Sequence, residues 1–377
     1  MDVKITYFKL LRAAIGILDF LELKENLSVE KWQELLQLAQ RQGTASVISD
    51  VLLSLPEEER PPKAMQTQMK AVCARSMMAQ AEQKQVMQKA MKALQDGGIT
   101  PVLLKGLGLA RNYPKPYLRS CGDVDIYVGK ENYHKGAKIL RETFPDMPRF
   151  ETEEDFFKHY NINVGSTAIE MHRVSAMFQH PKDAKVYDEL EREGLQNNMV
   201  HYTDGEDEWN EPEWKFNVMF VFIHSWDHFV TESASMRQIC DLTLLLHHHS
   251  DIAALERYLR TNLKKLHLFH AWQLYAYIMV NYLGLPKEQC PLYTNACAEK
   301  ADRMLSSILH GREKIEQKDK PAPKNVILRK LYTLRERIRK AREIRTYESH
   351  YARHMVATAF AQSWERFKKG ENTRKWE

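Results

Sequence analysis

Two aspartates inside an apolar run constrain this chain more than any other feature. Asp123 and Asp125 are separated by one residue in the segment Asp-Val-Asp-Ile-Tyr-Val, whose alternation of polar and apolar side chains is typical of a strand. Residues i and i+2 of a strand lie on one face, roughly 6 to 7 Å apart. Two ionised carboxylates at that distance repel each other and are costly to bury unless a cation neutralises them. The pair therefore predicts a site for Mg²⁺ or Mn²⁺, which bind carboxylate oxygens.

A strand, a glycine and a helix start precede this pair. The segment Pro-Val-Leu-Leu-Lys-Gly is predicted to be a buried strand that ends at Gly106, and Leu-Gly-Leu-Ala-Arg is compatible with a helix. A glycine lets a ligand approach the backbone, and the N–H groups of a helix start attract an anion. Lys105 and Arg119 add positive charge to this region. The sequence predicts that Lys105, Gly106 and Arg119 bind the phosphates of a nucleotide.

A third acid follows in the next strand-like segment. Residues 161–174 are predicted to form a hairpin that turns near Gly165, with Glu170 between two apolar neighbours. An isolated carboxylate is expensive in such a place, so Glu170 is the predicted third metal ligand and completes the catalytic set with Asp123 and Asp125. His172 shares the face of Glu170, where it contacts the nucleotide or serves the fold.

Composition sets outer limits on the class of protein. The chain has 377 residues, of which 44% are hydrophobic and 28% charged, as in ordinary globular proteins. No 18-residue apolar span is present, so we expect no membrane span. The 5 cysteines show no CxxC spacing, which favours reduced thiols and a cytoplasmic location.

The pattern along the chain predicts an α+β fold in which a small mixed β-sheet is flanked by helices. We expect a helical region over residues 1–95, an α/β core over 96–210 and a second helical region over 211–377. Within the core, the acidic segment 204–214 is expected to be a polar loop, either a lid or a connection. The Met-rich segment 77–91 is expected to be a core helix face or a protein interface.

Two features outside the core are open to more than one interpretation. His224 and His228 are spaced four apart on a predicted helix, which suits either a zinc site or a helix that lines the cleft. From residue 321 onward the chain carries 15 Lys and Arg against 6 Asp and Glu. These basic helices are either a solvated face or a surface for an acidic partner.

The motifs together resemble a known superfamily. A glycine-initiated helix after a strand, an Asp-x-Asp strand and a later acid are similar to the nucleotidyltransferases related to DNA polymerase β. More narrowly, LLKG, Tyr-Pro, LRSCGDVDIYV, IEMH, HSWDH and RQICDLTLLL resemble an uncharacterised bacterial nucleotidyltransferase family over about residues 95–250. The resemblance implies that Asp123, Asp125 and Glu170 bind metal and that Gly106 faces the phosphates. Leu107 stands where the superfamily commonly has Ser or Gly.

The expected activity is metal-dependent transfer of a nucleoside monophosphate from a nucleoside triphosphate, with ATP the first candidate, to an acceptor hydroxyl. The acceptor is a small molecule, a protein or an RNA end, and pyrophosphate leaves. One alternative is an inactive nucleotide-binding or protein-interaction module of the same fold, which the missing Gly-Ser hydroxyl favours. A third interpretation is an RNA modifier whose basic C-terminal helices hold the nucleic acid.

Overall fold

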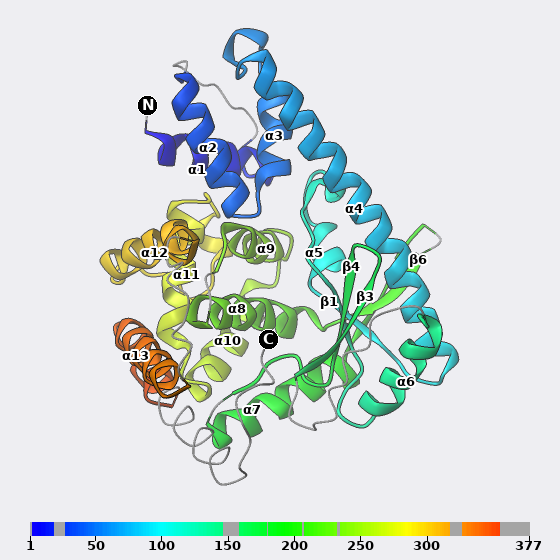
Figure 1. The fold of residues 1–377 in the computed structure, drawn as a ribbon. Coiled ribbons are helices and arrows are strands. Elements are labelled where there is room, and N and C mark those ends of the chain that lie inside the picture. Colours follow the sequence, from blue (N-terminus) through cyan, green and yellow to red (C-terminus); the bar gives the residue numbers. More distant parts are fainter. Residues whose placement is uncertain are drawn as a thin grey trace.

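The computed structural model describes residues 2–18, 27–145, 158–178, 180–205, 207–231, 234–316 and 326–354. It confirms the α+β fold (Figure 1). The strands are β1 Val102–Leu104, β2 Val124–Tyr127, β3 His159–Val164, β4 Thr167–His172, β5 Val200–Asp204 and β6 Asp207–Glu211. The α-helices are α1 Val3–Ala14, α2 Val29–Arg41, α3 Ala45–Ser54, α4 Lys63–Asp96, α5 Gly106–Ala110, α6 Tyr133–Thr143, α7 Pro181–Arg192, α8 Trp214–Thr231, α9 Met236–His247, α10 Ile252–Lys265, α11 Phe269–Asn281, α12 Ala298–Glu316 and α13 Val326–Arg345. Short helical turns of other kinds are η1 Glu57–Glu59, η2 Pro116–Leu118, η3 Glu193–Asn197 and η4 Lys287–Gln289.

The strands form one mixed sheet with the order β3-β4-β2-β1-β6-β5. β2 is an inner strand, parallel to β4 and antiparallel to β1. β3 and β4 make the predicted hairpin, which turns at Gly165 with φ +60°. The parallel register of β2 and β4 pairs Asp125 with Glu170. The sheet therefore brings two of the predicted metal ligands to neighbouring positions.

The two faces of the sheet pack against different helices. One face, which includes Val124 and Ile126, shares an apolar core with the C-terminal half of α4 and with α6. The opposite face is directed toward the helices that follow residue 214, and Tyr127 belongs to their core. Figure 1 shows the sheet between α4 on one side and α8 on the other. Alternation along β2 therefore places Asp125 on the side of α8, while its apolar neighbours face α4.

Helix α4 joins the N-terminal helices to the sheet. Its first half contacts α3, and its second half contacts α6, β2 and β4 (Figure 1). It ends at Asp96 as expected, because Gly98 turns the chain at φ +71° and its N–H bonds back to Gln95. The Met-rich segment divides accordingly, with Met87 and Met91 buried on the sheet and Met78 exposed. Because α4 belongs to both units, the predicted boundary near residue 95 remains a prediction.

The helices after residue 214 form a second core around α8, α9, α10, α11 and α12. α8 is buried along most of its length, and its neighbour α9 begins with a capping box between Ser235 and Gln238. In the described ranges, no helix is both long and apolar enough to cross a bilayer.

The expectation of a polar loop over residues 204–214 is wrong. Residues 200–204 and 207–211 are paired as the hairpin β5-β6, and β6 extends the sheet by pairing in parallel with β1. Trp209 is buried against the core on the α4 side, and its indole N–H donates to Glu211. The acidic composition suggested a loop, but the open edge of β1 and the burial of Trp209 outweigh the weak strand propensity of Asp and Glu.

The basic C-terminal region is described only in part. In α13, Ala341 and Ile344 are buried. Residues 355–377, which carry part of the predicted basic surface, lie outside the described residues.

Candidate active site

Asp125 lies at the centre of a group of charged side chains on the α8 side of the sheet. It is 5% exposed, and its Oδ1 lies 2.8 Å from Lys105 Nζ and 2.8 Å from His172 Nε2. Burial alone would raise the pKa of this carboxyl, but the Lys105 charge and the His172 hydrogen bond hold the pKa well below its ordinary value. Asp125 is therefore an anion at neutral pH.

The other two predicted carboxylates flank Asp125. Glu170 is half-buried beside it in the β2-β4 register. Asp123 precedes β2 by one residue and is exposed, which places it at the strand end rather than within the strand. Burial, the charge of Glu170 and the charge of Asp125 raise the pKa of Asp123 to about 6. The negative charges of Glu170 and Asp125 therefore act on Asp123, and the positive charges of Lys105 and Arg237 offset them only in part.

Two histidines stand beside the carboxylates. His172 is 1% exposed, and its Nε2 donates to Asp125 and lies 3.5 Å from Glu170 Oε2. His159, across the hairpin, places its Nε2 3.7 Å from Glu170 Oε1, and burial lowers its pKa. The ligand atoms of His159, Glu170 and His172 all lie within 4.8 Å of one another. His172 therefore fixes the orientation of Asp125 from behind, whereas His159 and Glu170 remain partly open to solvent.

Lys105 and Gly106 bring the glycine turn to the same place. Lys105 has φ of 47°, which is strained for a residue with a side chain, and Gly106 follows with φ of 44°. A Cβ on residue 106 would lie 3.3 Å from the carbonyl oxygen of Asp123. Glycine is required here because the start of α5 passes so close to the backbone before β2. This close approach positions the Lys105 amine on Asp125.

Helix α8 forms the opposite wall. His224 Nε2 lies 3.4 Å from Lys105 Nζ, and the ring of His228 contacts that of His224 at 4.5 Å between centroids. Burial and the nearby Lys105 charge hold the pKa of His224 well below its ordinary value, so the ring is neutral. Of the two interpretations of this histidine pair, the structure favours a helix that lines the cleft. Among the described residues, neither histidine belongs to a metal-binding group.

Arg119 is committed to a buried ion pair. Its side chain is 5% exposed, and its Nε and Nη2 donate to the two carboxylate oxygens of Asp241 at 2.8 and 2.6 Å. The hydroxyl of Tyr113 also donates to Asp241 at 2.8 Å. Three of the motif residues noted in the sequence thus form a link between the loop before β2 and helix α9. Arg119 holds this loop in place and has no open face toward a phosphate in this conformation.

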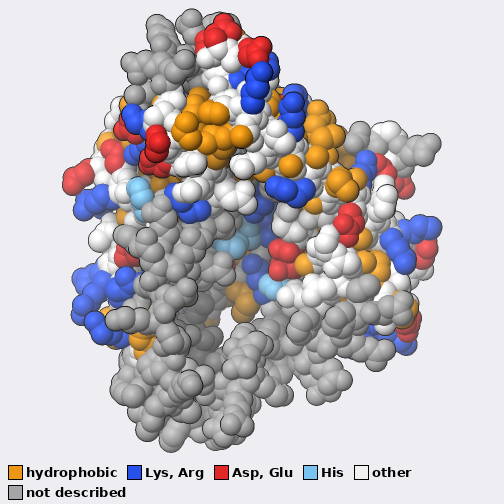
Figure 2. Space-filling model, turned by 45° about the horizontal axis from the view of Figure 1, so that its top comes forward, with side chains coloured by type: hydrophobic (Ala, Val, Ile, Leu, Met, Phe, Trp, Pro, Cys, Tyr) orange, Lys and Arg blue, Asp and Glu red, His pale blue; other side chains and the backbone are white. Residues whose placement is uncertain are grey.

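Two basic residues of the site were missed by the sequence analysis. Arg237, in the first turn of α9, donates to the Ser120 carbonyl at 2.6 Å, and its charge lowers the pKa of Asp123. Lys158 lies just before β3, where burial and the charge of Lys105 lower its pKa. Neither has a recognisable local motif, since each is one basic residue among many. Figure 2 shows the resulting hollow, in which basic, acidic and histidine side chains gather in the middle of one face.

The donor set fits a divalent cation. Asp125 and Glu170 are neighbours in the β2-β4 register, and the charges of both act on Asp123. In the described ranges, the groups whose ligand atoms all lie within 4.8 Å of one another include Glu170 with His159 and His172, but neither Asp123 nor Asp125. Carboxylate oxygens with water and phosphate are the usual ligands of Mg²⁺ and Mn²⁺. Asp123, Asp125 and Glu170 are the residues that would hold such an ion.

Comparison with known families agrees with this geometry. The model of the uncharacterised nucleotidyltransferase family matches residues 28–284, more than half of the chain. The chain belongs to this nucleotidyltransferase family. The match begins in the N-terminal helices and ends after α11, so the family unit includes the sheet, the carboxylates and the α8 wall. Searches of curated proteins and of solved structures found no match. Family membership supports a transferase.

The raised pKa of Asp123 leads to a stability prediction for the metal-free nucleotidyltransferase. In the folded state its pKa is about 6, above the value of 3.8 for a free carboxyl, so ionisation of Asp123 opposes folding. The stability present below about pH 4 is lost as the pH rises through 6. We expect Asp123→Asn to raise the unfolding midpoint at pH 7.5. The gain is on the order of 1 kcal/mol, because solvent screens this exposed side chain.

Thermal unfolding in chelator at pH 7.5 and at pH 4.5 measures this effect. The gain should shrink at the lower pH, where Asp123 is already protonated. Asp96→Asn, at an exposed carboxyl on α4, is the matched control and should change neither midpoint. A lower midpoint for Asp123→Asn at pH 7.5 would show that this carboxylate stabilises the fold.

Proposed function

We propose that this chain transfers a nucleoside monophosphate from a nucleoside triphosphate to an acceptor hydroxyl, with pyrophosphate as the second product. The observation that carries the proposal is the pairing of Asp125 with Glu170 in the sheet, with Asp123 just before β2 and its backbone against the glycine turn at Gly106. Carboxylates that hold a cation next to a phosphate-binding turn are the parts that this chemistry needs. The proposed donor is ATP, and the proposed cation is Mg²⁺ or Mn²⁺.

Each group has a distinct proposed role. Asp123, Asp125 and Glu170 would hold the metal, which would supply positive charge to the phosphates. Lys105 and Arg237 are the proposed contacts of the triphosphate, and the backbone at Gly106 allows its close approach. His172 is reassigned from the nucleotide to the positioning of Asp125, because it is almost fully buried. Arg119 is reassigned to the positioning of the loop before β2, because Asp241 occupies its donors.

The reaction requires one bond to form and one to break. The acceptor oxygen attacks the α-phosphorus, the new P–O bond forms, and the bond to the pyrophosphate oxygen breaks. The acceptor proton passes to a carboxylate, for which we propose Glu170. It is partly open to solvent, so an acceptor hydroxyl can reach it. The acceptor, a small molecule, a protein or an RNA end, enters from the α8 side, where His224 and His228 line the wall.

Nucleotide-dependent stabilisation tests the binding half of the proposal. We expect one or more of the four ribonucleoside triphosphates to raise the unfolding midpoint of the wild type only when Mg²⁺ or Mn²⁺ is present. A ligand at about 100 times its dissociation constant adds roughly 2.7 kcal/mol. Asp123→Asn/Asp125→Asn should abolish the shift, whereas Asp96→Asn should retain it. The best nucleotide of the four identifies the base preference.

A binding module without turnover is the second candidate. The contact that favours it is the ion pair between Lys105 and Asp125, which supplies without a metal part of the charge that a cation would provide. That module predicts a nucleotide-dependent shift of equal size with and without metal. A shift in neither condition would contradict both candidates.

A further inference from the structure

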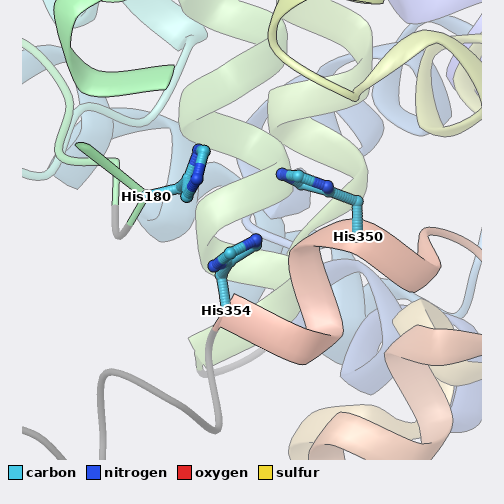
Figure 3. A group of neighbouring side chains, drawn as sticks. All are labelled: His180, His350 and His354. Atoms are coloured by element: carbon cyan, nitrogen blue, oxygen red, sulfur yellow. The ribbon is translucent and has the colours of Figure 1, made fainter. Parts of the chain in front are cut away.

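A second group of metal-binding side chains lies away from the sheet carboxylates. His180 caps the N-terminus of α7, and Asp183 lies in its first turn. His350 and His354 are four residues apart on the helical segment after α13, and His267 lies in the turn between α10 and α11. Figure 3 shows the rings of His180, His350 and His354 pointing toward one another from two separate elements. Their ligand atoms lie within 4.8 Å of one another.

The buried carboxylate at the centre of this group lacks a permanent positive partner. Asp183 is 6% exposed, and its Oδ1 accepts from His180 Nδ1 at 3.0 Å. Its Oδ2 lies 3.3 Å from His350 Nε2, and its Oδ1 lies 4.0 Å from His267 Nε2. In the part of the chain that the structure describes, these histidines are its only basic partners. A buried anion beside neutral imidazoles is poorly compensated.

Among the residues that the structure describes, one ring nitrogen of the group has no hydrogen-bond partner although it is buried. His350 Nε2 is buried and makes no hydrogen bond within the described residues, although it faces Asp183. Neutral imidazole nitrogens crowded around a carboxylate are the donor set of zinc sites, and His-x₃-His is a common ligand spacing.

We propose that His180, His350 and His354 bind a zinc ion that fastens the segment 349–354 to α7, with Asp183 as the carboxylate that orients His180. The hydrogen bond that His180 Nδ1 donates to Asp183 Oδ1 is the kind of carboxylate contact that orients a ligating histidine. His350 and His354 supply imidazole nitrogens from one helical turn, and His180 supplies one from the N-terminus of α7. The site is separate from the candidate active site and does not depend on the proposed transfer reaction.

The position of this site gives it a structural consequence. Tyr351 adjoins His350, and its hydroxyl lies 3.5 Å from Asp227 Oδ1 on α8, in the helix that carries His224 and His228. The Tyr351 ring also packs against Trp226. A zinc ion bound by these histidines would therefore hold Tyr351 in contact with Trp226 and Asp227 of α8.

Metal content tests the proposal directly. The full chain without an affinity tag, carrying Asp125→Asn/Glu170→Gln to remove the sheet carboxylates as competitors, is stripped with chelator and equilibrated with Zn²⁺. We expect about one tightly held zinc per chain. Adding His350→Gln/His354→Gln should remove it, and adding Asp183→Asn should weaken it about 10- to 100-fold. His134→Gln/His310→Gln, at two exposed histidines, is the matched control and should retain it.

Zinc-edge X-ray absorption provides a second readout. It is measured on the chain that carries Asp125→Asn/Glu170→Gln and keeps the histidine cluster intact. It should show a nearest shell of N and O atoms at about 2.0 to 2.2 Å with imidazole scattering. Equal zinc content in the cluster variant and its control would overturn the proposal, as would a sulfur shell near 2.3 Å. Absence of tightly bound zinc from the chain that carries only Asp125→Asn/Glu170→Gln would also overturn the proposal.

Discussion

Asp125→Asn should lower the rate of nucleotidyl transfer at least about 10³-fold. Metal ions contribute several kcal/mol of charge stabilisation in such reactions, and each 1.36 kcal/mol corresponds to about tenfold in rate. Asp125 is the central carboxylate, since Lys105 and His172 both contact it and Glu170 is its neighbour in the register. The amide keeps the shape but removes the charge that would hold the cation. Release of pyrophosphate, measured with extract as the source of acceptor, gives the rate.

Asp188→Asn is the matched control for this substitution. Asp188 is an exposed carboxylate on α7 that pairs with Lys130, and its loss should leave the rate within about twofold. A second comparison, His172→Gln, should have a smaller effect than Asp125→Asn and should shift the pH profile, because His172 acts through Asp125. Full activity in Asp125→Asn would contradict the assignment of the metal to this carboxylate.

Arg119→Ala should lower the free energy of unfolding by about 3 to 5 kcal/mol. The substitution leaves the buried carboxylate of Asp241 without its two charge-assisted hydrogen bonds, and an uncompensated buried charge is costly at this level. Urea denaturation measures the change. Lys130→Ala, which breaks an exposed ion pair, should cost no more than about 1 kcal/mol.

The double substitution Arg119→Met/Asp241→Leu tests how much of the lost stability comes from leaving Asp241 buried without a positive partner. Replacing both charges with apolar side chains of similar length removes the unpaired charge, so most of the lost stability should return. Transfer activity should nevertheless stay low, because the loop before β2 loses its fixed link to α9. A loss of less than about 1 kcal/mol for Arg119→Ala would show that this pair does not stabilise the fold.

The candidate site could be proposed from the sequence because its residues stand in segments with clear local periodicity. The alternation around Asp123 and Asp125, the apolar neighbours of Glu170 and the glycine after a strand each carry a local signal. The sheet then brings these segments together through the β2-β4 register. Asp123 lies just before the strand instead of inside it, and the roles of these residues remain predictions.

The partners of charged side chains were not accessible in the same way. Arg119 and Asp241 are far apart in the chain, and no spacing rule links a loop arginine to an aspartate on a later helix. The same holds for Arg237 and for the histidine cluster, whose members come from segments that are far apart in the sequence. Long-range pairing in three dimensions determines which charges are buried together, and a single sequence contains no direct record of it.

The prediction of a polar loop over residues 204–214, where the structure has part of the hairpin β5-β6, failed for a related reason. Its residues have weak strand propensity, but β1 offers an unpaired edge and Trp209 has a pocket on the α4 side of the sheet. Strand propensity depends on such neighbours more than on the residues themselves.

Transfer of label from the α-phosphate or the γ-phosphate tests the central claim most directly. Wild type and Asp125→Asn are incubated with extract, Mg²⁺ and a nucleoside triphosphate labelled at one phosphate, and the label in acceptors is followed. Nucleotidyl transfer predicts that the α-label enters an acceptor, that the γ-label leaves as pyrophosphate, and that Asp125→Asn does neither. Entry of the γ-label into an acceptor, or equal α-labelling by Asp125→Asn, would contradict the claim.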